Sequence, residues 1–173
     1  MKTNRTLKLI TLTAAIFGFA ATSFGQISSD QADAGVGATI IAPITVSQAH
    51  DLEFGYIVKT TTANIVTVTA AGARSATVTE SLLTSQTGDP SAAEFEVTGE
   101  DDFTYKVTLP TTITLEGDGG VDMTVDNFVT NLTNNIGTIG TNDTFTVGAN
   151  LNVNANQGVG LYTGEFQVTV AYE

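Results

Sequence analysis

Few side chains in this 173-residue sequence could carry out nucleophilic or acid–base catalysis, because it contains one histidine and no cysteine. A Ser–His–Asp relay would depend on His50, in the run Ser47-Gln48-Ala49-His50-Asp51, and the chain has no nucleophile-elbow sequence. The lack of cysteine excludes thiol catalysis and thiolate metal sites, and a single histidine excludes a histidine-rich metal site. We therefore expect a protein that is not an enzyme.

Carboxylates are numerous, with 18 Asp and Glu residues, so a pair for glycoside hydrolysis is not excluded by number. Two acidic segments offer the oxygen ligands that Ca²⁺ prefers, Glu100-Asp101-Asp102 and Glu116-Gly117-Asp118-Gly119-Gly120-Val121-Asp122. Neither has the spacing of an EF-hand loop. Most other carboxylates lie in polar turns or at alternate strand positions, where we expect solvent. We predict no resident cofactor, and calcium binding stays open as an alternative.

The elements that must position these side chains are strands. After residue 35 the chain is rich in Thr, Val, Ile and Phe, which fit a pleated sheet, with Gly, Asn and Asp between them at turns. Period-2 alternation predicts strands at residues 44–46, 64–69, 95–97, 103–109, 145–147, 151–153 and 166–172. We predict an all-β fold, an antiparallel sandwich or barrel, over residues 38–173.

The first residues have the three parts of a secretory signal peptide. Three basic residues within the first eight precede the apolar run Leu9–Ala21, and small residues follow as far as Gly25. We therefore predict a cleavable signal peptide at residues 1–25 and an exported protein. The run is shorter than the about 20 apolar residues that span a bilayer, and no later stretch is apolar enough. After cleavage three basic residues face 18 carboxylates, a formal charge of −15 that disfavours nucleic acid as a partner.

Residues 26–37 are predicted to form a flexible N-terminal arm. An alternation of mostly small apolar residues runs through it and ends before Pro43: Ala32, Ala34, Val36, Ala38 and Ile40. One interpretation is a frayed first strand. The other is a donor arm that completes a neighbouring subunit's sheet by β-strand addition. Because small residues bury less apolar area than large ones, a self-contained sandwich stays open as an alternative.

The C-terminus carries the most regular pattern. Side chains two residues apart on a strand point to the same face, which predicts an assembly strand with one apolar face: Gly160, Tyr162, Gly164, Phe166, Val168, Val170 and Tyr172. The penultimate tyrosine and the glycine fourteenth from the end resemble the C-terminal signature of chaperone–usher pilins. That resemblance implies a periplasmic chaperone and an outer-membrane assembly protein as partners.

A second resemblance covers residues from about Ala38 to Glu173. Five runs are similar to the bacterial domain-of-unknown-function 4402 family: Ile44–Val46, Asp51–Ile57, Ala93–Gly99, Tyr105–Pro110 and Tyr162–Phe166. The Phe54-Gly55-Tyr56 element is also similar to one in spore-coat-protein-U-like pilins, which usually contain cysteines that this chain lacks. What the resemblance implies is an exported immunoglobulin-like β-sandwich of fimbrial or surface character.

Together these observations predict a structural subunit of a cell-surface fibre, with identical or related subunits as partners. The alternative is a monomeric secreted or surface-attached binding module for glycan or calcium. The two differ in whether the N-terminal arm joins one subunit to the next.

Overall fold

The computed structural model describes residues 29–82, 88–118 and 120–173, so the predicted signal peptide lies outside the described residues. The chain divides into two compact units, Met1–Ala38 and Thr39–Glu173. In the first unit, residues 29–38 have exposed side chains and form neither helix nor strand. No helix in the described ranges has the length and apolar character needed to cross a membrane.

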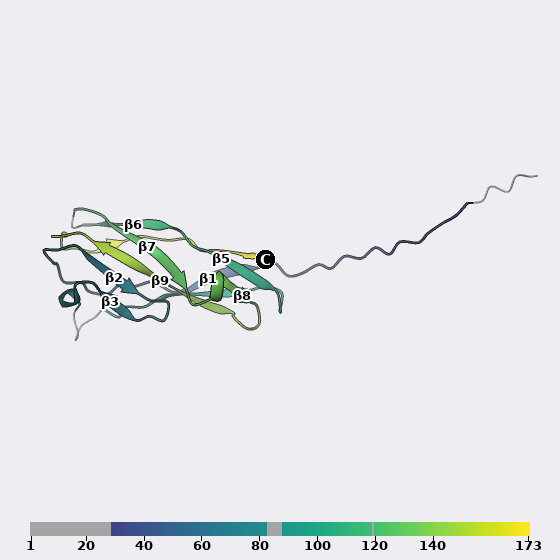
Figure 1. The fold of residues 1–173 in the computed structure, drawn as a ribbon, viewed down its shortest axis with the longest axis horizontal. Coiled ribbons are helices and arrows are strands. Elements are labelled where there is room, and N and C mark those ends of the chain that lie inside the picture. The colour runs from purple at the N-terminus through teal and green to yellow at the C-terminus, as the bar shows by residue number, and fades with distance from the viewer. Residues whose placement is uncertain (1–28, 83–87, 119) are drawn as a thin grey trace, which may run out of the picture. The chain divides into compact units, whose positions relative to one another are not determined.

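The second unit consists of two antiparallel sheets (Figure 1). The larger one has the path β1 (Thr45–His50), β4 (Ala93–Thr98), β9 (Thr144–Val153), β7 (Met123–Thr130), β6 (Thr112–Gly117) and β10 (Tyr162–Thr163). Off this path, β2 (Asn64–Val68) pairs with β9 and with β3 (Arg74–Ala76). The smaller sheet has the order β11 (Thr169–Tyr172), β5 (Thr104–Thr108) and β8 (Ile136–Thr138). Two single-turn 3₁₀ helices lie at Thr79–Ser81 and Thr133–Asn135. The predicted all-β, immunoglobulin-like antiparallel sandwich is confirmed.

The core forms because alternate residues of facing strands point inward. Tyr105 and Val107 of β5 are fully buried, and they pack with Phe145 and Val147 of β9. The rings of Phe145 and Phe95 stack with centroids 5.4 Å apart. This cluster lies near the end of the sandwich that carries the C-terminus. A second cluster, centred on β2 and the later part of β9, fills the other end.

The long strand β9 joins the two ends of the larger sheet. The sequence predicted two short strands here, at residues 145–147 and 151–153, but they are one strand of ten residues. Its first part pairs with β4 and its last part with β2 on the same side. Gly148 lies where the partner changes, and a Cβ built on it would lie 2.3 Å from the Val68 carbonyl oxygen. The point at which β9 changes its partner from β4 to β2 therefore requires glycine.

Candidate functional site

The C-terminal segment is not the single long strand that its alternation predicts. Residues 162–163 form β10, which pairs with β6, and residues 169–172 form β11, which pairs with β5 in the other sheet. Gly160 precedes β10 and is exposed. The segment changes sheets between these strands, opposite the stretch at Pro110 where its partner passes from β5 to β6. The even-numbered residues nevertheless keep one face, as the alternation predicts.

That face is incompletely covered. Four inward-pointing side chains of the segment pack against the core cluster and yet remain half-exposed: Phe166, Val168, Val170 and Tyr172. Ile44, which precedes β1, and Val46 within it are half-exposed against the same cluster. The paired strand β5, by contrast, buries Tyr105 and Val107 to 0% and 1% exposure. The core is therefore sealed under β5 and open along the C-terminal segment.

The backbone of this segment has an unpaired edge. Glu173 donates its N–H to the Thr104 carbonyl at 3.1 Å, and the Leu161 carbonyl accepts the Asp118 N–H at 3.3 Å. Successive N–H and C=O groups of an antiparallel strand alternate in direction, so the odd-numbered residues of β10 and β11 bond to β6 and β5, whereas residues 164–168 between them lie in no strand. Tyr162, Val170 and Tyr172 consequently direct their backbone groups to the opposite edge. Among the described residues, no strand pairs with that edge.

The strand β1 lies beside β11, and it too has one unpaired edge, since β4 is its partner on the other side. We call the strip between β1 and residues 164–172 the open seam. It combines unpaired backbone groups with half-covered apolar side chains. Both are what an additional strand would satisfy, because sheet edges bind strands through their main chain and select them through alternate side chains.

One end of the open seam is held by the penultimate tyrosine. The Tyr172 hydroxyl accepts the Glu100 N–H at 2.7 Å and donates to the Ala42 carbonyl at 2.9 Å. The Glu100 carboxylate in turn accepts the Ala42 N–H at 3.0 Å. A Cβ on Gly99 would lie 2.4 Å from the Tyr172 hydroxyl, so glycine leaves the room for it. These contacts fix the point at which the chain leaves the sandwich toward the arm.

The predicted donor residues are exposed. Of the larger ones, Val36 has 99% of its surface exposed and Ile40 has 96%. Nothing lies within 4 Å of a Cβ built on Gly35 or Gly37. Val36 and Ile40 share one face of the extended arm with alanines, and this apolar face is exposed.

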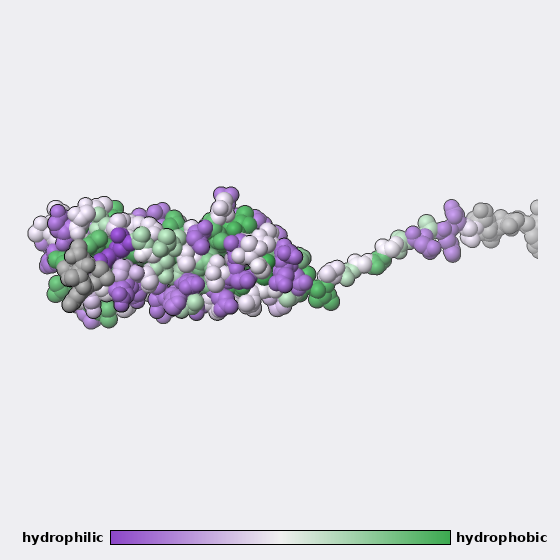
Figure 2. Space-filling model, turned by 90° about the horizontal axis from the view of Figure 1, so that it is seen from below, coloured by the Kyte–Doolittle hydropathy of each residue, from purple (hydrophilic) through white to green (hydrophobic). Residues whose placement is uncertain are grey.

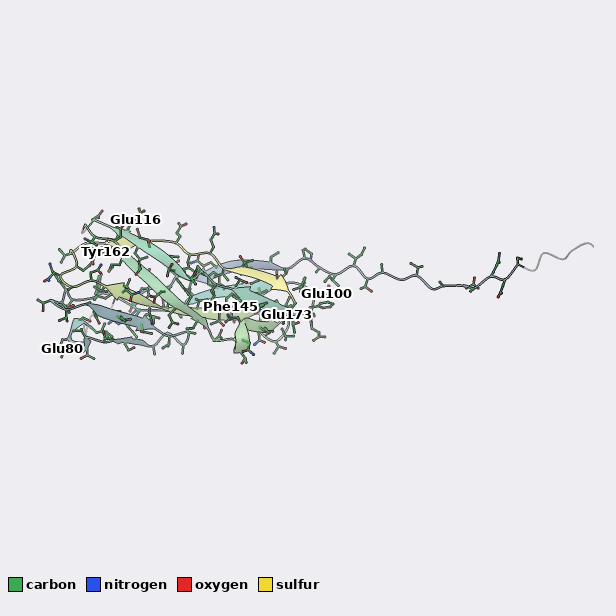
Figure 3. The ribbon with its side chains drawn as sticks, turned by 45° about the horizontal axis from the view of Figure 1, so that its top comes forward. Glu80, Glu100, Glu116, Phe145, Tyr162 and Glu173 are labelled. Atoms are coloured by element: carbon green, nitrogen blue, oxygen red, sulfur yellow. The ribbon has the colours of Figure 1, made fainter. Side chains whose placement is uncertain are left out.

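The candidates for catalysis and metal binding do not come together. His50 Nε2 is 3.7 Å from Glu94 Oε2 on the exposed side of β1. Within the described ranges, no three His, Asp or Glu side chains approach closely enough to hold a metal ion. In the first predicted calcium loop, Glu100 is engaged with Ala42, whereas in the second, Glu116 belongs to β6. Figure 3 places Glu100 and Glu116 toward opposite ends of the sandwich.

Some of the hollows on the described surface are shallow, including the following two. One, of about 520 Å³, is lined mainly by small residues of the loops after β2 and before β4, including Ala70, Gly72 and Ala92. The other, of about 490 Å³, lies at the β6–β10 edge beside Gly164 and contains Glu116 and Glu165. Of the described tyrosines, Tyr56 is the most exposed, whereas Tyr105 is a core residue. Over the face in Figure 2, apolar residues are scattered among polar ones.

The sequence indicated the C-terminal face and the arm, but not their neighbours. Ala42 and Gly99 carried no chemical pattern of their own, and Glu100 was identified only as part of a candidate calcium loop, because their roles here arise from contacts across 58 to 130 residues of chain. Phe128 was also missed. Its ring packs on Phe166 with centroids 5.1 Å apart, and it forms part of the floor of the open seam.

Comparison with known proteins identifies a family. The family described as "Domain of unknown function (DUF4402)" matches residues 44–172, nearly the whole sandwich. No curated protein matches the chain, and no solved structure does.

Proposed function

The chain belongs to the DUF4402 family, and from this premise we propose that it is an exported structural subunit of a surface fibre. In this proposal, the N-terminal arm of one subunit fills the open seam of the next by β-strand addition. The seam and the arm are complementary in kind. The open seam lacks a strand, and the N-terminal arm is an extended segment with an apolar face.

The observation that carries the proposal is the combination of half-buried inward side chains at residues 166–172 with the unpaired edges of β10 and β11. An exposed apolar strand edge is an aggregation hazard, and proteins normally cover or blunt it. Here the edge is long and carries large residues such as Phe166 and Val168. A partner strand would bury them at a gain of about 25 cal/mol per Å² of apolar surface.

Such contacts build a fibre because they are heterologous. The arm and the seam are different surfaces of one chain, so each added subunit presents a new seam or a new arm. A head-to-tail contact that does not close on itself grows without a fixed end. During export, a periplasmic chaperone would cover the seam and an outer-membrane protein would assemble the subunits, as the pilin resemblance implies.

The test is a denaturing gel of periplasmically expressed protein, unheated and boiled. The full mature chain should give a ladder that survives detergent and collapses on boiling. A chain starting at Thr39 should give monomer. Val36→Asp should also abolish the ladder, because it places a charge on the apolar face of the arm. Gly37→Asp is the matched control, since it adds the same charge on the opposite face and should leave the ladder intact.

Folding must be checked in the same samples by circular dichroism. A folded, monomeric mature chain in every lane would contradict the proposal. Loss of the ladder in both aspartate variants would show that charge alone, rather than the apolar face, controls assembly.

A further inference from the structure

We propose that the arm of a second copy lies antiparallel to residues 164–172, with Val36 opposite Val168, and seats that copy's domain on the β10 end of the sandwich. This inference rests on the proposed function and adds to it the direction, the register and the contact surface. Three arguments support it: the sizes of the side chains that the register pairs, their charges, and the position that the register gives to the second copy's domain.

Side-chain size selects the direction. In the antiparallel register, three large residues of the seam meet alanines, a valine meets a valine, and Ile40 meets a glycine: Gly164 with Ile40, Phe166 with Ala38, Val168 with Val36, Val170 with Ala34, and Tyr172 with Ala32. The parallel register with the same centre pairs Gly164 with Ala32 and Tyr172 with Ile40. It therefore places Ile40, the largest of the alternating arm residues, against Tyr172, the largest residue of the seam. Protein interiors are close-packed, so the arrangement with even volumes is favoured.

Small donor residues are then an adaptation to this seam. The half-exposed Phe166 already lies against Phe95 and Phe128, with ring centroids 5.9 and 5.1 Å apart. Alanine opposite such a ring lets the two backbones pair without displacing it. Ile40 lies opposite Gly164, where a Cβ would lie 2.6 Å from the Thr114 carbonyl oxygen and 2.8 Å from Leu115 Cδ2, so Ile40 would pack on the half-buried Leu115.

Charge selects the same direction. The outward faces of the arm and the segment carry Asp33 and Glu165, both exposed. The parallel register places these two carboxylates directly opposite each other, which destabilises a strand pair. The antiparallel register places Asp33 opposite Ala171 and Glu165 opposite Thr39. No like-charged pair then lies face to face.

The register also fixes where the second copy's domain lies. Ala42 of that copy is bound to its own Tyr172 and Glu100, two residues beyond Ile40. With Ile40 opposite Gly164, Ala42 comes opposite Tyr162, and the domain that follows meets the β10 end. Figure 3 places Tyr162 toward the opposite end of the sandwich from Glu173.

The β10 end presents an apolar surface to receive it, which we call the β10-end patch. It consists of Val121, Val159 and Leu161, which are 67%, 79% and 71% exposed. The two loops that carry it are braced together. Buried Gln157 donates to the Val121 carbonyl and, at 2.9 Å, to the Tyr162 hydroxyl. The patch is therefore a fixed surface, and a second copy's domain would cover it.

Engineered cysteines test the register cleanly, because the chain has none of its own. Ala171 is exposed, and its backbone faces β5, so its position toward the new strand is a non-hydrogen-bonded one. Cα atoms at such positions lie about 4.5 Å apart, within reach of a disulfide. In the proposed register, Asp33→Cys pairs with Ala171→Cys. In the parallel register, Thr39→Cys pairs with Ala171→Cys, and the wrong pair is about 20 Å apart at 3.3 Å per residue.

The expected result is a boiled, non-reduced ladder from the D33C/A171C chain, absent from T39C/A171C and abolished by reductant. A ladder from T39C/A171C would overturn the direction. Absence of cross-links from both, with the heat-sensitive ladder intact, would overturn the register and leave the proposed function standing. A cross-linked monomer would show that the arm fills its own seam. Failure of the cysteine-free chain to form any ladder would remove the proposed function itself.

Discussion

The hydroxyl of Tyr172, the penultimate residue, donates a hydrogen bond of 2.9 Å to the carbonyl of Ala42, 130 residues earlier in the chain. The same hydroxyl accepts the Glu100 N–H. One side chain therefore ties the end of the last strand, the turn after β4 and the base of the N-terminal arm. A terminal strand is normally free to fray, and this contact opposes fraying at the place where the fold is open.

Replacing Tyr172 by Phe should lower the free energy of unfolding by about 1 kcal/mol, because a typical net hydrogen bond contributes that much. The local effect should be larger, since the Glu100 N–H loses its acceptor. Urea unfolding gives the first quantity, and hydrogen exchange of the Glu100 amide gives the second. Tyr56→Phe is the matched control, because its side chain is 64% exposed. Unchanged exchange at Glu100 in Y172F would contradict the clamp.

Gly148→Ala should destabilise the sandwich strongly, by roughly 1–3 kcal/mol or more. The added Cβ would lie 2.3 to 2.5 Å from backbone atoms of Val68, Thr69 and Ala70, which cannot rotate away as a flexible side chain could. Gly35→Ala makes the same chemical change where nothing lies within 4 Å and should leave the unfolding midpoint unchanged. Thermal unfolding of both variants tests this prediction, and equal melting temperatures would contradict the close packing around Gly148.

Stability should fall as the pH rises above about 10. Burial, assisted by the negative charge of Asp143, raises the pKa of Tyr105 above its ordinary value of 10.0. The unfolded chain then loses this proton at lower pH than the folded chain, so the folded state binds more protons and loses stability with rising pH. In Tyr105→Phe this part of the alkaline loss should disappear. Denaturant midpoints at pH 8 to 11 measure it, with Tyr56→Phe expected to follow the unsubstituted chain.

Leu161→Glu should weaken association between subunits about tenfold or more while leaving the monomer folded. Leu161 is 71% exposed in the single chain, and full burial of a leucine is worth roughly 1.5–3 kcal/mol. Leu161→Met keeps the apolar contact and should assemble normally. Light scattering of assembling subunits measures the difference. Equal assembly by the two variants would exclude the β10-end patch from the contact.

Several features of the fold could be predicted from the sequence. Alternation placed β2, β4 and β5 correctly because their inward residues are large and regularly spaced, as in Phe95 and Val97, but it divided β9 into two short strands. The resemblance to the DUF4402 family is confirmed over residues 44–172. The strands β6 and β7 were not predicted. In β7 the inward face shifts from Met123 and Val125 to Phe128, because a bulge with Asn127 at φ 49° breaks the period of two.

The sequence by itself determined which residues of the C-terminal segment share a face, since that follows from the alternating geometry of any extended chain. It also determined the composition of the arm. Only the tertiary structure decided that the segment is divided between two sheets, opposite Pro110, whose missing N–H cannot continue a ladder. It alone decided that Val168 and Val170 stay half-covered and that Tyr172 reaches Ala42. The burial of these valines and the contact between Tyr172 and Ala42 depend on which strands pair with each other. Local periodicity does not determine how distant segments pair.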